Sequence, residues 1–449
     1  MVPEGRRGRG EVAIEAKAPS ARDYSVAPVT LIAPGRRLEI LAWAGALLFL
    51  GTIASPGFGV ITLPVTFFLK NKLHLAAHQT AAFNLWTGLP LYFAFGFGLA
   101  RDRWSPLRRG DRGHLVLFGA VSAAIFAGMA FAPPTYWVLL LGILLVTAAL
   151  MMVASAMNGL VSAIGRQHVM AGQASVAILL ANAVPTVASY LLGGQLSQLL
   201  EGERAAAAAR ALFLVAAAIM AAIAILAAVG PRTLFGAART ELSSATSVLA
   251  DVRRLLRWRP TWPALIIQLL WQFGPALGLA MQYHMANELH ASDAEVGDFY
   301  AIFFACLIPT YGLYAWLCQR VRLSKLLWWG AATSVPQMAP LLLVHSATSA
   351  LWAAVPVGLM GGFATAAIID LTIRSCPEGL AGTMMMLVTT SGYWVAVRFG
   401  DVWGTDLYDH HGGFATAVWA TIAVYALILP MLLLVPKRLL STSDGQLAA

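Results

Sequence analysis

The chain alternates between long apolar runs and short polar segments. Twelve of these runs are long enough to cross a hydrocarbon layer of roughly 30 Å as helices. We therefore predict an all-α membrane protein with twelve transmembrane helices. The predicted spans are residues 39–69, 79–100, 115–132, 136–164, 171–198, 207–230, 262–287, 295–318, 324–344, 349–372, 382–405 and 414–435.

The span that begins at Trp262 has an interruption in the middle of its apolar pattern. Residues 273–278 include two glycines and Pro275, and a proline removes a backbone donor and clashes with the preceding helical turn. We expect the helix to kink or open here, where neighbouring helices can satisfy the freed carbonyls. Three amide side chains of this span share the spacing of one helical face: Gln268, Gln272 and Gln282.

The first span carries a similar interruption, at Pro56. Each interrupted span leaves the membrane through a short polar segment, and residues 71–74 match residues 287–290 at the Asn, Leu and His positions. Interrupted segments in corresponding positions of two halves point to the binding site of a transporter. We predict two pseudo-symmetric six-helix bundles, residues 38–230 and 262–436, with gating hinges at Pro56 and Pro275.

The composition supports a membrane protein and the distribution of charge predicts its orientation. Hydrophobic residues make up 59% of the chain and charged residues 11%, against about a quarter in soluble proteins. If both termini are cytoplasmic, 25 of the 30 Lys and Arg residues lie in predicted cytoplasmic segments, as the positive-inside rule requires. The net charge of +9 thus reflects topology in a cell membrane and contact with membrane lipids, and we expect no nucleic-acid partner.

Three polar segments complete the predicted organisation. Residues 1–37 read as a disordered cytoplasmic tail and residues 437–449 as a second cytoplasmic tail. Residues 231–261 form a cytoplasmic linker. Within it, residues 248–258 predict an amphipathic helix whose arginines suit the membrane interface.

The span 382–405 holds two charges at membrane depth, Arg398 and Asp401, on one face with Ser391 and Trp394. A charge there costs about 2.5–3.5 kcal/mol on insertion scales, so such residues usually mark a transport pathway. In that interpretation Arg398 anchors an anionic substrate and Asp401 carries a proton. In the other interpretation the two side chains pair with each other and only lock helices together.

We expect the remaining functional residues to come from both halves of the chain. Asp370 and Arg374 are one turn apart beside the cytoplasm and predict a structural or gating ion pair. The predicted substrate-binding residues are polar or aromatic: Arg398, Trp394, Gln268, Trp271, Gln272, Asn84 and Trp86.

Other kinds of site are not indicated. Cys306, Cys318 and Cys376 form no disulfide or metal framework. The acidic and histidine residues between 406 and 411 are typical of a solvated loop. No phosphate-binding glycine loop is present, and no paired acids or His and Ser residues occur at one depth. We therefore expect no metal, no cofactor and no enzymatic activity.

Two sets of motifs resemble known transporters. Gly98, Asp102 and Arg103 resemble the loop signature of the major facilitator superfamily, in which the glycine allows close helix contact and the acid caps or pairs across the cytoplasmic gate. The segments FFLKNKLHLAAHQ, YHMANELHASDAEVGDFYA and CPEGLAGT resemble the folate-biopterin transporter family within that superfamily. The resemblance implies two six-helix bundles, secondary transport by alternating access, and gating roles for Asp102 and Arg103.

These observations predict a proton-coupled secondary transporter for a small organic solute that is anionic or heteroaromatic, such as a pteridine. Two alternatives remain open. An uncoupled exporter of lipophilic compounds would keep the fold and would not need Asp401. A membrane sensor would bind its ligand without moving it.

Overall fold

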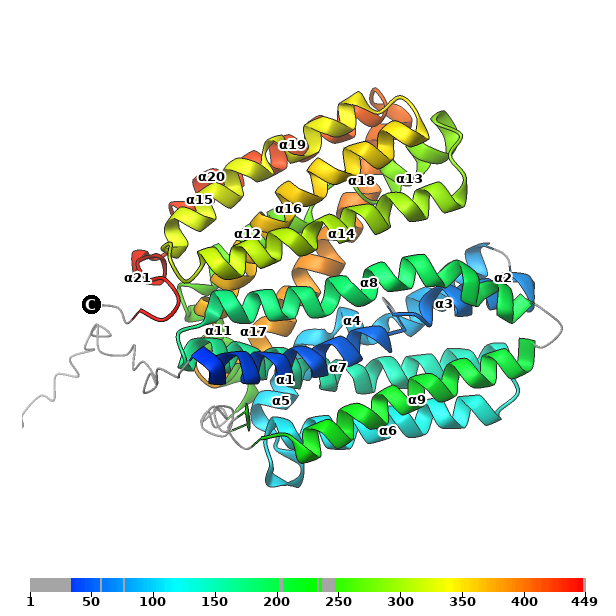
Figure 1. Cartoon of the computed structure of the whole chain (residues 1–449), viewed down its shortest axis with the longest axis horizontal. Coiled ribbons are helices and arrows are strands. Elements are labelled where there is room, and N and C mark those ends of the chain that lie inside the picture. Colours follow the sequence, from blue (N-terminus) through cyan, green and yellow to red (C-terminus); the bar gives the residue numbers. More distant parts are fainter. Residues whose placement is uncertain are drawn as a thin grey trace, which may run out of the picture.

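The computed structural model describes residues 34–446, apart from 57–58, 76, 202–204, 232–233 and 236–246. The described chain is helical throughout and forms two bundles that lie side by side (Figure 1). The first bundle contains α1 (Pro34–Ile53), α2 (Thr62–Asn71), α3 (Ala77–Thr87), α4 (Leu89–Tyr92), α5 (Ala94–Arg103), the short η1 (Pro106–Arg108), α6 (Asp111–Phe131), α7 (Tyr136–Gln167), α8 (Ala171–Glu201) and α9 (Ala205–Val229).

The second bundle follows the helix α11 (Val248–Arg257). It contains α12 (Thr261–Gln272), α13 (Leu279–Tyr283), η2 (His284–Glu288), α14 (Asp293–Leu317), α15 (Leu323–Ser334), η3 (Pro336–Leu343), α16 (Ala347–Ser375), α17 (Ala381–Val388), η4 (Thr389–Ala396), α18 (Val397–His410), α19 (Phe414–Ala426), α20 (Ile428–Leu432) and α21 (Lys437–Leu440).

Seven of the predicted spans are long and apolar enough to cross a membrane within the described residues, the last of them as α19 and α20 with a turn at Leu427 between them. The other five predicted spans are each divided into shorter helical pieces. Two of these divisions fall where the glycine and proline residues predicted them, after α1 and after α12. Since residues 273–278 are not helical, the predicted glutamine stripe does not continue as one helical face to Gln282.

Small residues allow the helices of each bundle to approach closely. A Cβ atom on Gly119 of α6 would lie 3.2 Å from the backbone of Ala224 in α9. A Cβ atom on Gly330 of α15 would lie 3.1 Å from the Cα atom of Ala364 in α16. In lipid there is no hydrophobic drive between helices, so such close contacts supply much of the packing energy.

Both described ends of the chain lie at the same end of the molecule, which we call the terminal end (Figure 1). The linker helix α11 joins the two bundles there. Its buried Asp251 pairs with Arg103 of α5 at 2.7 Å. The indole of Trp258, directly after α11, donates to the carbonyl of Ser375 in α16 at 2.9 Å. The linker therefore bonds to both bundles.

The bundles come into close contact where Gly98 of α5 faces the start of α17. A Cβ atom at Gly98 would lie 2.7 Å from both the Gly382 carbonyl oxygen and the Thr383 Cα atom. These are backbone atoms, which cannot turn away as a flexible side chain could. Gly96 on the same helix has nothing within 4 Å of its Cβ position.

We predict that Gly98→Ala destabilises the protein by about 1–3 kcal/mol, the usual cost of overpacking. Gly96→Ala, the matched control, should unfold at the wild-type temperature. Thermal unfolding of the purified proteins in detergent measures both. Equal unfolding temperatures for the two variants would contradict the close contact between α5 and α17.

Candidate functional site

The terminal end is closed by a buried carboxylate that reaches from one bundle to the other. Asp102 of α5 is fully buried. Its oxygens accept hydrogen bonds from the Gly382 amide at 3.1 Å, the Thr383 amide at 2.7 Å and the Thr383 hydroxyl at 2.6 Å. The first amides of a helix have no partner within it, and their partial positive charge favours an anion. Asp102 therefore caps α17 across the contact between the two bundles.

Arg101 is the partner that sequence reasoning missed. Its side chain is 4% exposed and lies 2.6 Å from Asp102. Its Nε atom donates to Asp111, at the start of α6, at 2.6 Å. A buried charge needs a compensating partner, so Arg101 is what allows two acids to stay buried together. In contrast, the predicted gating residue Arg103 pairs with Asp251 of the linker.

The predicted pair of Asp370 and Arg374 is present, at 2.7 Å on α16. The Tyr314 hydroxyl of α14 also donates to Asp370, at 2.8 Å. Arg374 extends further, to Asp444 near the C-terminus at 2.9 Å. Asp444 has no neighbour in the sequence that would have indicated this role, and only the folded chain brings it to the gate.

The break between α12 and α13 is held by side chains from three neighbouring helices. The Ala276 amide donates to the Thr421 hydroxyl of α19 at 3.0 Å. The Tyr300 hydroxyl of α14 donates to the Leu277 carbonyl at 2.9 Å. The Leu279 amide donates to Asp401 of α18 at 3.1 Å. Freed backbone groups cannot turn to water at membrane depth, so these contacts define the shape of the break.

Close backbone contacts fix the break against α18. A Cβ atom at Gly278 would overlap the Asp401 carboxylate, and one at Gly404 would overlap the carbonyl of Pro275. The ring of Phe273 stacks on Trp403 with centroids 5.7 Å apart. Pro275 thus lies inside a tightly packed contact with α18.

Arg398 and Asp401 lie together on α18. Their side chains approach to 3.6 Å, with Arg398 58% exposed and Asp401 11% exposed. Asp401 therefore has two roles in the structure: it pairs with Arg398 and it accepts the first amide of α13. Arg398 extends beyond the packed surface of the protein.

The two predicted glutamines of α12 face η4. A Cβ atom at Gly392 would lie 2.9 Å from Gln268 and 3.5 Å from Gln272, so the glycine allows this approach. Gln268 is 4% exposed, and its Oε1 atom is buried without a hydrogen-bond partner among the described residues. A buried acceptor without a hydrogen bond is energetically costly. A hydrogen-bond donor on a ligand would remove this cost.

The other predicted lining residues behave differently. Trp271 is buried and stacks on Tyr425 with ring centroids 5.0 Å apart, so it packs within the second bundle. On α3 in the first bundle, Asn84 is exposed and Trp86 is 54% exposed. The side chain of Trp394 lies outside the described part of the structure.

The carbonyl of the predicted gating residue Pro56 accepts a hydrogen bond from the Thr62 hydroxyl at 2.9 Å, which closes the turn after α1.

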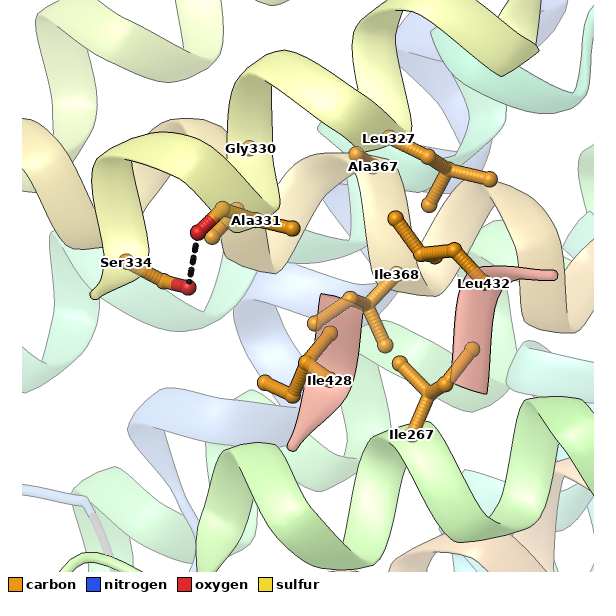
Figure 2. A pocket seen from close by; sticks show the side chains of 10 residues that line it. Ile267, Leu327, Gly330, Ala331, Ser334, Ala367, Ile368, Ile428 and Leu432 are labelled. Atoms are coloured by element: carbon orange, nitrogen blue, oxygen red, sulfur yellow. Dashed lines mark hydrogen bonds between the residues drawn. The ribbon is translucent and has the colours of Figure 1, made fainter. Parts of the chain in front are cut away.

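A small crevice lies elsewhere, inside the second bundle (Figure 2). Its walls are apolar residues of α12, α15, α16 and α20, and its one hydroxyl, Ser334, donates back to the Ala331 carbonyl at 2.8 Å. None of the predicted site residues lines it. We interpret this crevice as imperfect helix packing.

Similarity to known structures identifies the fold. No protein-family model matches the chain, and no curated protein matches it. Among solved structures, FucP of E. coli in the outward conformation, a major facilitator superfamily transporter, superposes with a TM-score of 0.66 and 16% identity over 88% of this chain and 98% of that one. The chain has the major facilitator superfamily fold.

Two other structures with this fold show the same similarity. The human organic anion transporter MFSD10 superposes with a TM-score of 0.61 and 14% identity, over 89% of this chain and 100% of that one. The proton:xylose symporter XylE superposes with a TM-score of 0.62 and 12% identity, over 89% of this chain and 96% of that one. At these identities the shared property is the arrangement of helices.

We predict that Thr421→Val destabilises the protein, because the buried Ala276 amide loses its acceptor at a cost of about 1–3 kcal/mol. Thr421→Ser keeps the hydroxyl and serves as the control. Thermal unfolding in detergent compares the two variants. A valine variant as stable as the serine variant would show that the break does not depend on this hydrogen bond.

Proposed function

We propose that the protein is a secondary transporter that moves a small organic solute across a cell membrane by alternating access, coupled to protons. The observation that carries this proposal is the gate, where Asp102 of one bundle caps a helix of the other. Hydrogen bonds of this kind break and re-form without unfolding either bundle. The distribution of Lys and Arg supports a cytoplasmic terminal end, in which case the closed gate corresponds to an outward-facing state.

Proton coupling rests on Asp401. As a carboxylate it holds both Arg398 and the first amide of α13. Adding a proton to this carboxyl removes the charge that attracts both partners. Arg398 is then released toward an anionic substrate, and the segment beyond the break is free to move. FucP and XylE are both described as proton symporters, which supports coupling in a chain of this fold.

The residues favour an anionic or heteroaromatic substrate. Arg398 presents a guanidinium that matches a carboxylate with two parallel hydrogen bonds. Gln268 contributes a buried acceptor for an N–H or O–H group. The resemblance to folate-biopterin transporters supports a pteridine-like solute, and MFSD10 is described as an organic anion transporter. Asn84 and Trp86 would contribute from the first bundle.

The first test identifies the solute class. Thermal-shift measurements with pterins, nucleosides, sugars and organic acids on the purified protein should give the largest stabilisation with an anionic or heteroaromatic compound. Arg398→Ala should weaken binding of an anionic compound by about tenfold or more, because both charge-assisted hydrogen bonds to the carboxylate are lost. Unchanged affinity in that variant would remove Arg398 from the binding site.

The second test concerns coupling. Wild-type protein in liposomes should accumulate the bound compound when a proton gradient is applied. Asp401→Asn should still exchange the compound across the membrane but should lose gradient-driven accumulation, because the amide carries no exchangeable proton. Full accumulation by Asp401→Asn would favour the uncoupled exporter. Binding without any flux in the wild type would favour the sensor.

A further inference from the structure

The C-terminal segment Ser441–Gln446 lies against both bundles at the terminal end. The Gly445 amide donates to the Val169 carbonyl of the first bundle at 2.6 Å. The Asp444 amide donates to the Cys318 carbonyl of the second bundle at 2.9 Å. Arg374 donates to the Thr442 carbonyl at 3.0 Å. Six residues after the last helix therefore bridge the two halves of the molecule.

Asp444 makes the central contact of this segment. Its side chain is 1% exposed and lies 2.9 Å from Arg374. Its oxygens accept from the Gln173 amide at 2.9 Å and from the Gly172 amide at 3.3 Å. These amides begin α8 of the first bundle, whereas Arg374 belongs to α16 of the second. One carboxylate thus caps a helix of one bundle and pairs with a charge of the other.

This arrangement resembles the Asp102 contact, since a carboxylate again caps the start of a helix. The two contacts differ in the segment that supplies the carboxylate. Both capped helices begin with the sequence Ala-Gly, at Ala171 and at Ala381. A Cβ atom on Gly382 would lie 2.8 Å from Asp102, whereas one on Gly172 would lie 2.6 Å from the Cβ of Cys318 and 2.9 Å from a carboxylate oxygen of Asp370. Cys318 therefore has the position next to the capped helix that Asp102 has in the first half. Asp370 pairs with Arg374, and the carboxylate that accepts from the first amides of α8 is supplied by the tail.

We propose that Ser441–Gln446 is a detachable latch that holds the terminal end closed by supplying Asp444 to the start of α8. When the latch leaves, the α8 amides and Arg374 lose their shared partner, and the gate opens more readily. The latch is attached through α21, which has no fully buried residue and packs against the core only through the half-buried Leu439 and Leu440. The two halves of the gate then differ. Asp102 belongs to a helix of the first bundle, whereas Asp444 belongs to a segment that can detach.

Burial raises the pKa of Asp444 to about 7, and the charge of Asp370 adds to the rise. Arg374 and the amides of Gln173 and Gly172 act in the opposite direction. The thiol of Cys318 is the other titratable group in contact, at 3.6 Å. Because the docked carboxyl binds a proton more tightly than an exposed one, docking is favoured as the pH falls through about 7.

The native cysteines provide the test. Cys318 lies under the latch, Cys376 lies in the gate beneath Ser162 of the first bundle at 3.3 Å, and Cys306 lies on α14 away from both. We would measure N-ethylmaleimide labelling of each cysteine by peptide mass spectrometry in the purified full-length protein without substrate. The result is then independent of whether the protein transports anything.

Ending the chain after Ser441, or the milder Asp444→Ala, should raise labelling of both Cys318 and Cys376 about tenfold, as expected for loss of a charge-assisted hydrogen bond. Cys306 labelling should stay constant, and Ser441→Ala should match the wild type. A rise at Cys318 alone would overturn the latch, because the tail would then cover the thiol without holding the gate. No rise at either cysteine would overturn it as well.

A rescue variant tests the mirrored arrangement directly. Cys318→Asp in the chain ended after Ser441 places a carboxylate where the first half has Asp102. It should return Cys376 labelling to the wild-type rate, whereas Cys318→Ser in the same shortened chain should not. Equal labelling in the aspartate and serine variants would overturn the proposal.

The pH dependence gives one more readout. Lowering the pH from about 8 to about 6 should reduce wild-type Cys376 labelling relative to Asp444→Ala measured at the same pH. The ratio removes the effect of pH on the thiol reaction itself. A ratio that rises on acidification would contradict docking through Asp444.

Discussion

A buried carboxylate set against the first amides of a helix is the interaction on which the closed state depends. Asp102 accepts three hydrogen bonds at the start of α17 while Arg101 balances its charge. Without such a partner, the first amides of the helix have to bond to water instead. The contact therefore holds only when the bundles are correctly docked, which makes it suitable for a gate. A glycine is required at position 98 because the backbones of α5 and α17 are in contact there.

The same physical rule explains the broken span in the second bundle. Residues 273–278 lose their helical hydrogen bonds, and Thr421, Tyr300 and Asp401 replace them from three different helices. This ties the geometry of the break to the charged pair on α18. A change in the charge of Asp401 would thus affect the backbone of the neighbouring span, and the proposed proton coupling rests on this contact.

The similarity to the solved transporters concerns architecture, since 12–16% identity accompanies the shared arrangement of helices. Apolar spans, small contact residues and helix breaks can be met by many sequences, so a fold persists while its site changes. The features that the proposals use are local: the acceptor of Gln268, the exposed Arg398 and a tail that bridges the two bundles. A narrower relationship to folate-biopterin transporters rests on short motifs and on the proposed chemistry.

The sequence by itself determined the membrane class, the apolar spans and the interruptions at Pro56 and Pro275, because hydropathy and backbone chemistry act locally. It also indicated the pair of Asp370 and Arg374, which is one helical turn apart. The partners of Asp102, the pairing of Arg103 with the linker and the inward packing of Trp271 were decided only by the tertiary structure. So was the place of Asp444, 70 residues beyond Arg374. Each of these depends on which helices meet, and burial and electrostatic pairing between distant segments leave no periodic signal in a single chain.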